Sequence, residues 1–100
     1  MNEVEFRSWM CGENITKKVQ GDLVSRLKKI ERTFGNIDLD SEYKKDKCEF
    51  LLSLFLNKGE NAAMQSYGNV ALPIGKYQLS VYRYAIRKYI SFLQTISEQQ

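Results

Sequence analysis

The stretch from Tyr77 to Ile96 reads YQLSVYRYAIRKYISFLQTI and is the most regular part of the chain. Its apolar residues recur every three or four positions, which at 100° per residue places them on one arc of about 120°. A periodicity of this kind predicts a long amphipathic helix whose apolar side faces a core. The residues of this arc are Leu79, Tyr82, Ile86, Tyr89, Ile90, Leu93 and Ile96.

The other side of this predicted helix carries cations and tyrosines, and no acidic residue lies between Lys76 and Gln94. One edge is formed by Lys76, Arg83, Arg87 and Gln94, and the adjoining stripe by Tyr77, Tyr84, Lys88 and Ser91. Arginine and lysine neutralise phosphates, and tyrosine can donate to a phosphate or pack on a base. The pattern therefore suits nucleic acid, with an ordinary solvated surface or a protein contact as the alternative.

A second long helix is predicted from Lys17 to Phe34, with Thr16 as its N-cap and Gly35 at its end. Gly21 lies inside this helix, where it either costs stability or marks close packing against another helix. Apolar residues at helical spacing form its core stripe: Val19, Leu23, Leu27, Ile30 and Phe34. Cations point away from that stripe, as they also would on an ordinary solvated face: Lys17, Lys18, Lys28, Lys29 and Arg32.

The remaining segments complete a helical bundle. Helices are predicted over Glu3–Cys11, around Leu39–Lys45, and over Lys47–Leu56 behind an Asp46–Glu49 capping box. The stretch Asn57–Gly75 is interrupted by glycines and one proline, and it could hold a helical turn over Asn61–Ser66. With 100 residues, the chain suffices for a single domain, residues 1–100. We therefore expect an all-α fold, a compact bundle of four to five helices with one long irregular crossover.

Composition argues against catalysis. The sequence has no histidine, which excludes the serine–histidine triad and the usual general base near neutral pH. Its two cysteines cannot form a four-cysteine metal site, and its glycines do not gather into a phosphate loop. Asp38, Asp40 and Glu42 lie where helix caps are expected, so we interpret them as caps rather than as metal ligands. We expect no enzyme activity, no cofactor and no metal.

The chain is expected to be cytoplasmic. Its acidic start lacks the basic and apolar regions of a signal peptide, and no apolar run approaches the about 20 residues that a membrane span needs. Cys11 and Cys48 are then expected to stay reduced, with Cys48 as core filler. The net charge of +3 is distributed in patches, which suits an anionic partner on one face. No membrane partner is expected.

A protein-interaction module is the alternative function. Apolar residues on the flanks of the predicted helices could form a partner surface or a homodimer seam, as in a small phage or mobile-element regulator. The residues expected on that surface are Phe50, Leu54, Leu56, Val81 and Phe92.

Part of the sequence resembles a known family. Tyr82–Leu93 is similar to the closing helix of the core-binding (SAM-like) N-terminal domain of phage integrases and other tyrosine recombinases. Phe6–Met10 resembles the opening helix of that domain, and Ile15-Thr16 followed by Leu23–Glu31 resembles its capped long helix. A closely similar domain precedes restriction-endonuclease-like modules in bacterial proteins. The resemblance covers Phe6 to Leu93 and consists mostly of helical patterning.

The resemblance implies a helical domain that clamps duplex DNA, without the catalytic module of the recombinases. In the family, DNA contacts come from the second and the last helices. Carried over to this chain, these contacts fall on Lys17, Lys18, Lys28, Lys29, Arg83, Arg87 and Lys88. Lys76, Tyr77 and Tyr84 join the candidate interface through their place on the last helix. The expected function is a non-catalytic DNA-binding or DNA-positioning domain of a recombinase-like or restriction-like protein, contacting mainly the phosphate backbone.

Overall fold

The computed structural model of the chain describes residues 1–68, 72 and 79–98, and all regular structure in these residues is helical. The three longest helices are α1 (Glu3–Gly12), α2 (Lys17–Thr33) and α6 (Leu79–Glu98). Between α2 and α6 lie α3 (Leu39–Asp46), α4 (Glu49–Ser53), the 3-10 helix η1 (Leu56–Gly59) and α5 (Ala62–Gln65). The predicted all-α class is confirmed. The described residues hold six α-helices rather than four or five, because the short segments at α3 and α5 both form helical turns.

Polar side chains begin three of these helices, and two of these caps, Thr16 and Asp38, are predicted from the sequence. The Thr16 hydroxyl accepts from the Val19 N–H at the start of α2, and Asp38 accepts from the Ser41 N–H at the start of α3. Asn61 caps α5 by accepting from the Met64 N–H at 2.8 Å. Each cap satisfies a backbone N–H group that has no partner inside its helix.

The predicted helix over Lys47–Leu56 is wrong at both ends. Lys47 and Cys48 have φ of 57° and 65°, in the left-handed region, so α4 begins only at Glu49. The expected capping box is not formed, because Asp46 Oδ2 accepts instead from the Phe50 N–H at 2.9 Å. The helix ends at Ser53 and the chain continues into η1. The segment is therefore a sequence of short turns rather than one helix.

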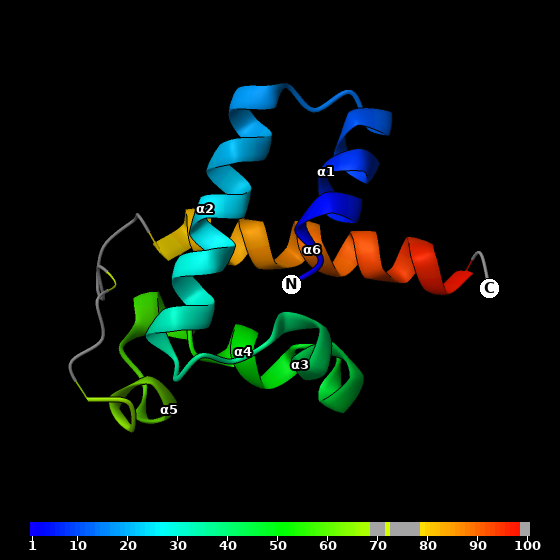
Figure 1. The fold of residues 1–100 in the computed structure, drawn as a ribbon. Coiled ribbons are helices and arrows are strands. Elements are labelled where there is room, and N and C mark those ends of the chain that lie inside the picture. Colours follow the sequence, from blue (N-terminus) through cyan, green and yellow to red (C-terminus); the bar gives the residue numbers. More distant parts are fainter. Residues whose placement is uncertain (69–71, 73–78, 99–100) are drawn as a thin grey trace.

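The three long helices form the centre of the fold. α1 and α2 lie side by side, α6 runs across behind both, and α3 to α5 lie below them (Figure 1). One continuous apolar core joins side chains from all six helices. The predicted stripe of α2 is buried except at Val19, which is 40 % exposed, while Val24 and Gln20 are buried in its place. Gln20 donates from its amide to the Ile15 carbonyl at 2.7 Å, which makes its burial tolerable.

Polar contacts fasten the N-terminal segment to three helices. The Asn2 N–H donates to the Tyr89 hydroxyl of α6 at 2.7 Å, and that hydroxyl donates to Asp40 of α3. The Met1 amino group lies 3.0 Å from Glu31 Oε2 and 2.6 Å from Asp38 Oδ1. Glu31, near the end of α2, thus shares one carboxylate oxygen between this amino group and the Leu39 N–H. These contacts hold α2, α3 and α6 together beside the core.

The two cysteines are free, with Cys48 buried in the core as predicted and Cys11 exposed at the end of α1. Among the described residues, no helix combines the length and the apolar character that crossing a membrane requires.

Candidate nucleic-acid interface

α6 presents its cations outward because its buried residues all lie on the opposite arc. The buried residues of this helix are Leu79, Ala85, Ile86, Tyr89 and Phe92. Arg87 is exposed, Arg83 is half-buried at the edge of the arc, and Tyr84 is 53 % exposed. Two arginines and a tyrosine therefore share the outward side of the longest helix.

Neither Arg83 nor Arg87 forms an ion pair with any residue that the structure describes. The sequence contains no acidic residue between Glu60 and Glu98, so no carboxylate on α6 before its last residue competes for them. The two arginines are one helical turn apart, which places their Cβ atoms about 6 Å from each other. Their guanidinium groups can thus reach neighbouring phosphates of one strand.

Lys88 is directed toward α1 rather than along the Arg83–Arg87 edge. Its Nζ lies 5.8 Å from the centre of the Trp9 ring, within the range of a cation–π contact. The Trp9 ring in turn lies 5.9 Å from the ring of Phe92. Lys88 therefore contributes charge at the α1 border of the interface, at one side of the arginine pair.

The cations of α2 do not join those of α6. Lys28 contacts α1, with its Nζ 2.6 Å from Glu3 Oε1. Lys17 and Lys18 are exposed in the first turn of α2, and Lys29 is half-buried further along. Because α2 and α6 direct their apolar sides to the same core, their outward sides belong to different faces of the molecule. The structure thus separates the two sets of candidate contacts that the sequence groups together.

Two candidate residues, Lys76 and Tyr77, lie outside the described residues, as do residues 69–71 and 73–75 of the predicted crossover and residue 78 of the predicted last helix. The described site therefore consists of Arg83, Tyr84 and Arg87, with Lys88 at its border.

The expected apolar partner surface is wrong as a set. Leu54 and Phe92 are buried in the core, and Val81 is half-buried. Leu54 turns inward because α4 ends at Ser53, and its carbonyl accepts from the Asn61 amide at 3.0 Å. Phe92 is covered by the rings of α1. Only Phe50 and Leu56 remain exposed, at 47 % and 52 %.

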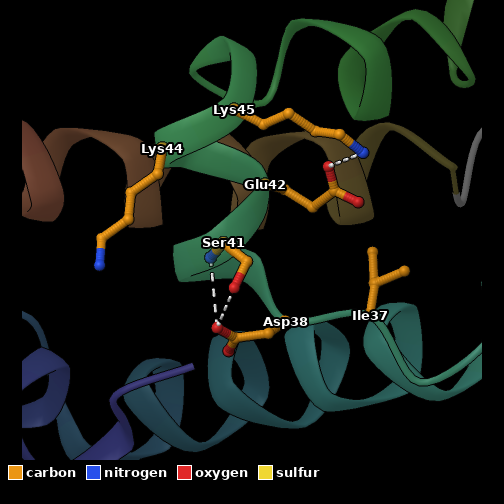
Figure 2. Close-up of a pocket in the computed structure, with 6 residues that line it drawn as sticks. All are labelled: Ile37, Asp38, Ser41, Glu42, Lys44 and Lys45. Atoms are coloured by element: carbon orange, nitrogen blue, oxygen red, sulfur yellow. Dashed lines mark hydrogen bonds and ion pairs between the residues drawn. The ribbon is translucent and has the colours of Figure 1, made fainter.

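The carboxylates around α3 are already engaged by the protein. They border a surface hollow of about 440 Å³ lined by Ile37, Asp38, Ser41, Glu42, Lys44 and Lys45. Figure 2 shows Asp38 bonded to Ser41, and Lys45 bent toward Glu42 with its Nζ 4.0 Å from the carboxylate. Asp40 accepts from Tyr89, as described above. Among the described residues, no group of cysteine and acidic side chains is arranged to hold a metal ion.

A second group of cations lies at the contact of α1 with α2, and the sequence does not predict that its members lie together. Arg7 of α1 lies beside Lys28 and Arg32 of α2, although these two helices are separated by a turn. Only the pairing of the two helices brings these side chains together, and helical periodicity does not reveal that pairing.

Comparison of the chain with protein-family models, with curated proteins and with solved structures finds no match. The resemblance to the core-binding domain of tyrosine recombinases therefore stays a prediction.

Proposed function

We propose that the chain binds duplex DNA through the outward side of α6. The observation that carries this proposal is the pair Arg83 and Arg87, one turn apart, beside the exposed Tyr84 and engaged by no described carboxylate. Cations of the other helices support it less well, since Lys28 and Lys45 already contact Glu3 and Glu42.

The contact is mainly with the phosphate backbone. A guanidinium group can bind two phosphate oxygens at once, and each neutralised phosphate releases condensed counterions. The Tyr84 hydroxyl adds a neutral donor to phosphate at the same edge. Contacts of this type fix the position of DNA on the protein without reading its sequence. In this proposal the chain positions DNA and carries out no chemistry of its own, in keeping with the resemblance to a non-catalytic domain.

The test is the salt dependence of duplex binding by the wild type and by an Arg83→Gln/Arg87→Gln variant. We expect the slope of log affinity against log salt to become shallower by about two units, since each lost phosphate contact removes about 0.9 unit. The arginines lie outside the core, so thermal unfolding of the variant is expected to match that of the wild type.

A matched control removes one exposed charge from α3 and one from the C-cap that follows it, in a Lys44→Gln/Lys47→Gln variant. This control loses the same net charge as the arginine variant, but the charges it loses do not lie on α6. It should therefore retain the wild-type slope. Equal losses in both double variants would mean that net charge alone drives binding. That outcome, or an unchanged slope in the arginine variant, overturns the proposal.

A further inference from the structure

A cationic groove runs between α1 and α2, away from the outward side of α6. It has a volume of about 270 Å³ and is lined by Arg7, Gly21, Val24, Ser25, Lys28 and Arg32. A second hollow of about 290 Å³ adjoins it, since Lys28 and Arg32 line both. Three cations from two helices thus converge on one concave surface.

The Glu3 carboxylate of α1 contacts two of these three cations. Glu3 Oε1 lies 2.6 Å from Lys28 Nζ, and Glu3 Oε2 lies 3.0 Å from Arg7 Nε. Both contacts lower the pKa of Glu3 from its ordinary value, and the hydrogen bond with Lys28 has the larger effect. Arg32 is exposed and forms no ion pair with any described residue. Glu31 lines the adjoining hollow, where the Met1 amino group and the Leu39 N–H already engage it. The three cations outnumber these two carboxylates, so the groove keeps an excess of positive charge, with Glu3 between Lys28 and Arg7.

Gly21 in the wall of this groove has no packing explanation. It lies inside α2, where glycine is among the least favourable residues. A Cβ atom added at Gly21 would meet nothing within 4 Å, so no neighbouring helix requires the missing side chain. The missing side chain does leave the backbone open to the groove, one turn before Ser25. A ligand that approaches the helix closely would account for a glycine at this position.

We propose that the α1–α2 groove binds a phosphate group. Arg32 and Lys28 provide its charge partners, Ser25 donates from its hydroxyl, and Gly21 admits the ligand to the helix surface. A phosphate dianion carries more charge than a carboxylate and offers three acceptor oxygens, so it displaces Glu3 from Lys28 and Arg7. The site is independent of the α6 interface, because it lies on a different face and shares no residue with it.

The test follows backbone amide resonances during titration with inorganic phosphate at constant ionic strength. We expect saturable shifts centred on Gly21 and Ser25. Arg32→Gln should weaken the binding by about fivefold, the size of one exposed ionic contact. Glu3→Gln should instead tighten it, because the competing internal anion is gone. If Glu3 served only as a structural partner of α2, Glu3→Gln would not tighten phosphate binding.

Two further variants sharpen the test. Lys29→Gln removes one charge from the next position of α2 but not from the groove, so it should leave the affinity unchanged. Gly21→Ala should raise the melting temperature and lose phosphate affinity, because a methyl group then occupies the open wall. Absence of saturation, equal effects of Arg32→Gln and Lys29→Gln, or full phosphate binding by Gly21→Ala would each overturn the proposal.

The same resonances distinguish the source of the phosphate. A short duplex with a 5′-phosphate that shifts them at lower concentration than its unphosphorylated counterpart assigns the groove to a DNA end. Equal behaviour of the two duplexes, with inorganic phosphate still binding, assigns it to a small phosphate compound. The Arg83→Gln/Arg87→Gln variant should bind phosphate normally. The two proposals can therefore fail separately: loss of the α6 interface would not affect phosphate binding in the groove, and loss of the groove would not affect DNA binding by α6.

Discussion

Tyr89 joins more parts of the molecule than any sequence pattern indicates. Its ring is buried with those of Phe6 and Phe92, at centroid distances of 4.9 and 5.4 Å. Its hydroxyl accepts from the Asn2 N–H and donates to Asp40. Burial, and then the neighbouring carboxylate of Asp40, raise the pKa of Tyr89, so the group stays neutral and can act as both donor and acceptor. One hydroxyl thus connects the N-terminal segment, α3 and α6.

Removing that hydroxyl should destabilise the protein. Tyr89→Phe keeps the ring but leaves the Asn2 N–H and the Asp40 carboxylate without their partner. We expect the free energy of unfolding to fall by about 1.5–3 kcal/mol, the range for a hydrogen bond to a charged group. Urea denaturation measures it. The control is Tyr84→Phe, whose hydroxyl is exposed and bonds to no described residue, and its effect should stay within about 0.5 kcal/mol. Equal effects of the two changes would contradict the assigned role of Tyr89.

At the scale of the elements, the junction of α3 with α4 is conformationally strained. Lys47 and Cys48 are both left-handed, a region that residues with a Cβ atom enter at a cost of about 1–2 kcal/mol each. The junction persists because both of its sides are fastened. Cys48 is buried in the core, and the Lys47 N–H donates to the Tyr43 carbonyl at 2.8 Å to close α3. Packing on either side of the turn therefore imposes its backbone conformation.

Glycine should relieve this strain at Lys47. The position follows the last residue of α3, is exposed and has φ of 57°, which is where glycine normally ends a helix. We expect Lys47→Gly to raise the free energy of unfolding by about 1 kcal/mol. Lys44→Gly removes the same charge inside α3, where φ is helical, and should lower it by about 1 kcal/mol. Chemical denaturation of both variants gives the comparison, and a destabilised Lys47→Gly would contradict the left-handed turn.

The sequence predicts the elements whose determinants are local. The apolar periodicities of α2 and α6 extend over many turns, and Thr16 and Asp38 are of residue types that cap helices. The break at Lys47–Cys48 is different, because neither residue type indicates a positive φ and the apolar residues from Cys48 onward keep a helical spacing. The end of α4 at Ser53, which turns Leu54 inward, has no residue signal either. The Glu3–Lys28 contact and the burial of Phe92 depend on how α1 packs against α2 and α6, which one chain's periodicity does not specify.

Across the whole molecule, stability should depend on pH at both ends of the scale. Burial disfavours the charged Met1 amino group, but contacts with Asp38 and Glu31 outweigh it and raise its pKa above the ordinary 8.0. This contribution to stability is complete below pH 8 and is lost as the pH rises through the folded value. The same contact chiefly lowers the pKa of Asp38 from its ordinary 3.8, so that contribution is lost only as the pH falls below this value.

Asp38→Asn isolates the alkaline effect. Asparagine caps helices as well as aspartate does, so α3 should form normally while one partner of the Met1 amino group loses its charge. We expect the wild-type free energy of unfolding to decline as the pH rises above 8, and the variant to decline less steeply there. Above pH 9 the Cys48 thiol, whose pKa burial raises to about 12, adds a decline in the same direction to both proteins. Urea denaturation at closely spaced pH values separates these effects. Parallel curves for the two proteins just above pH 8 would show that the contact of the amino group with Asp38 contributes nothing to folding.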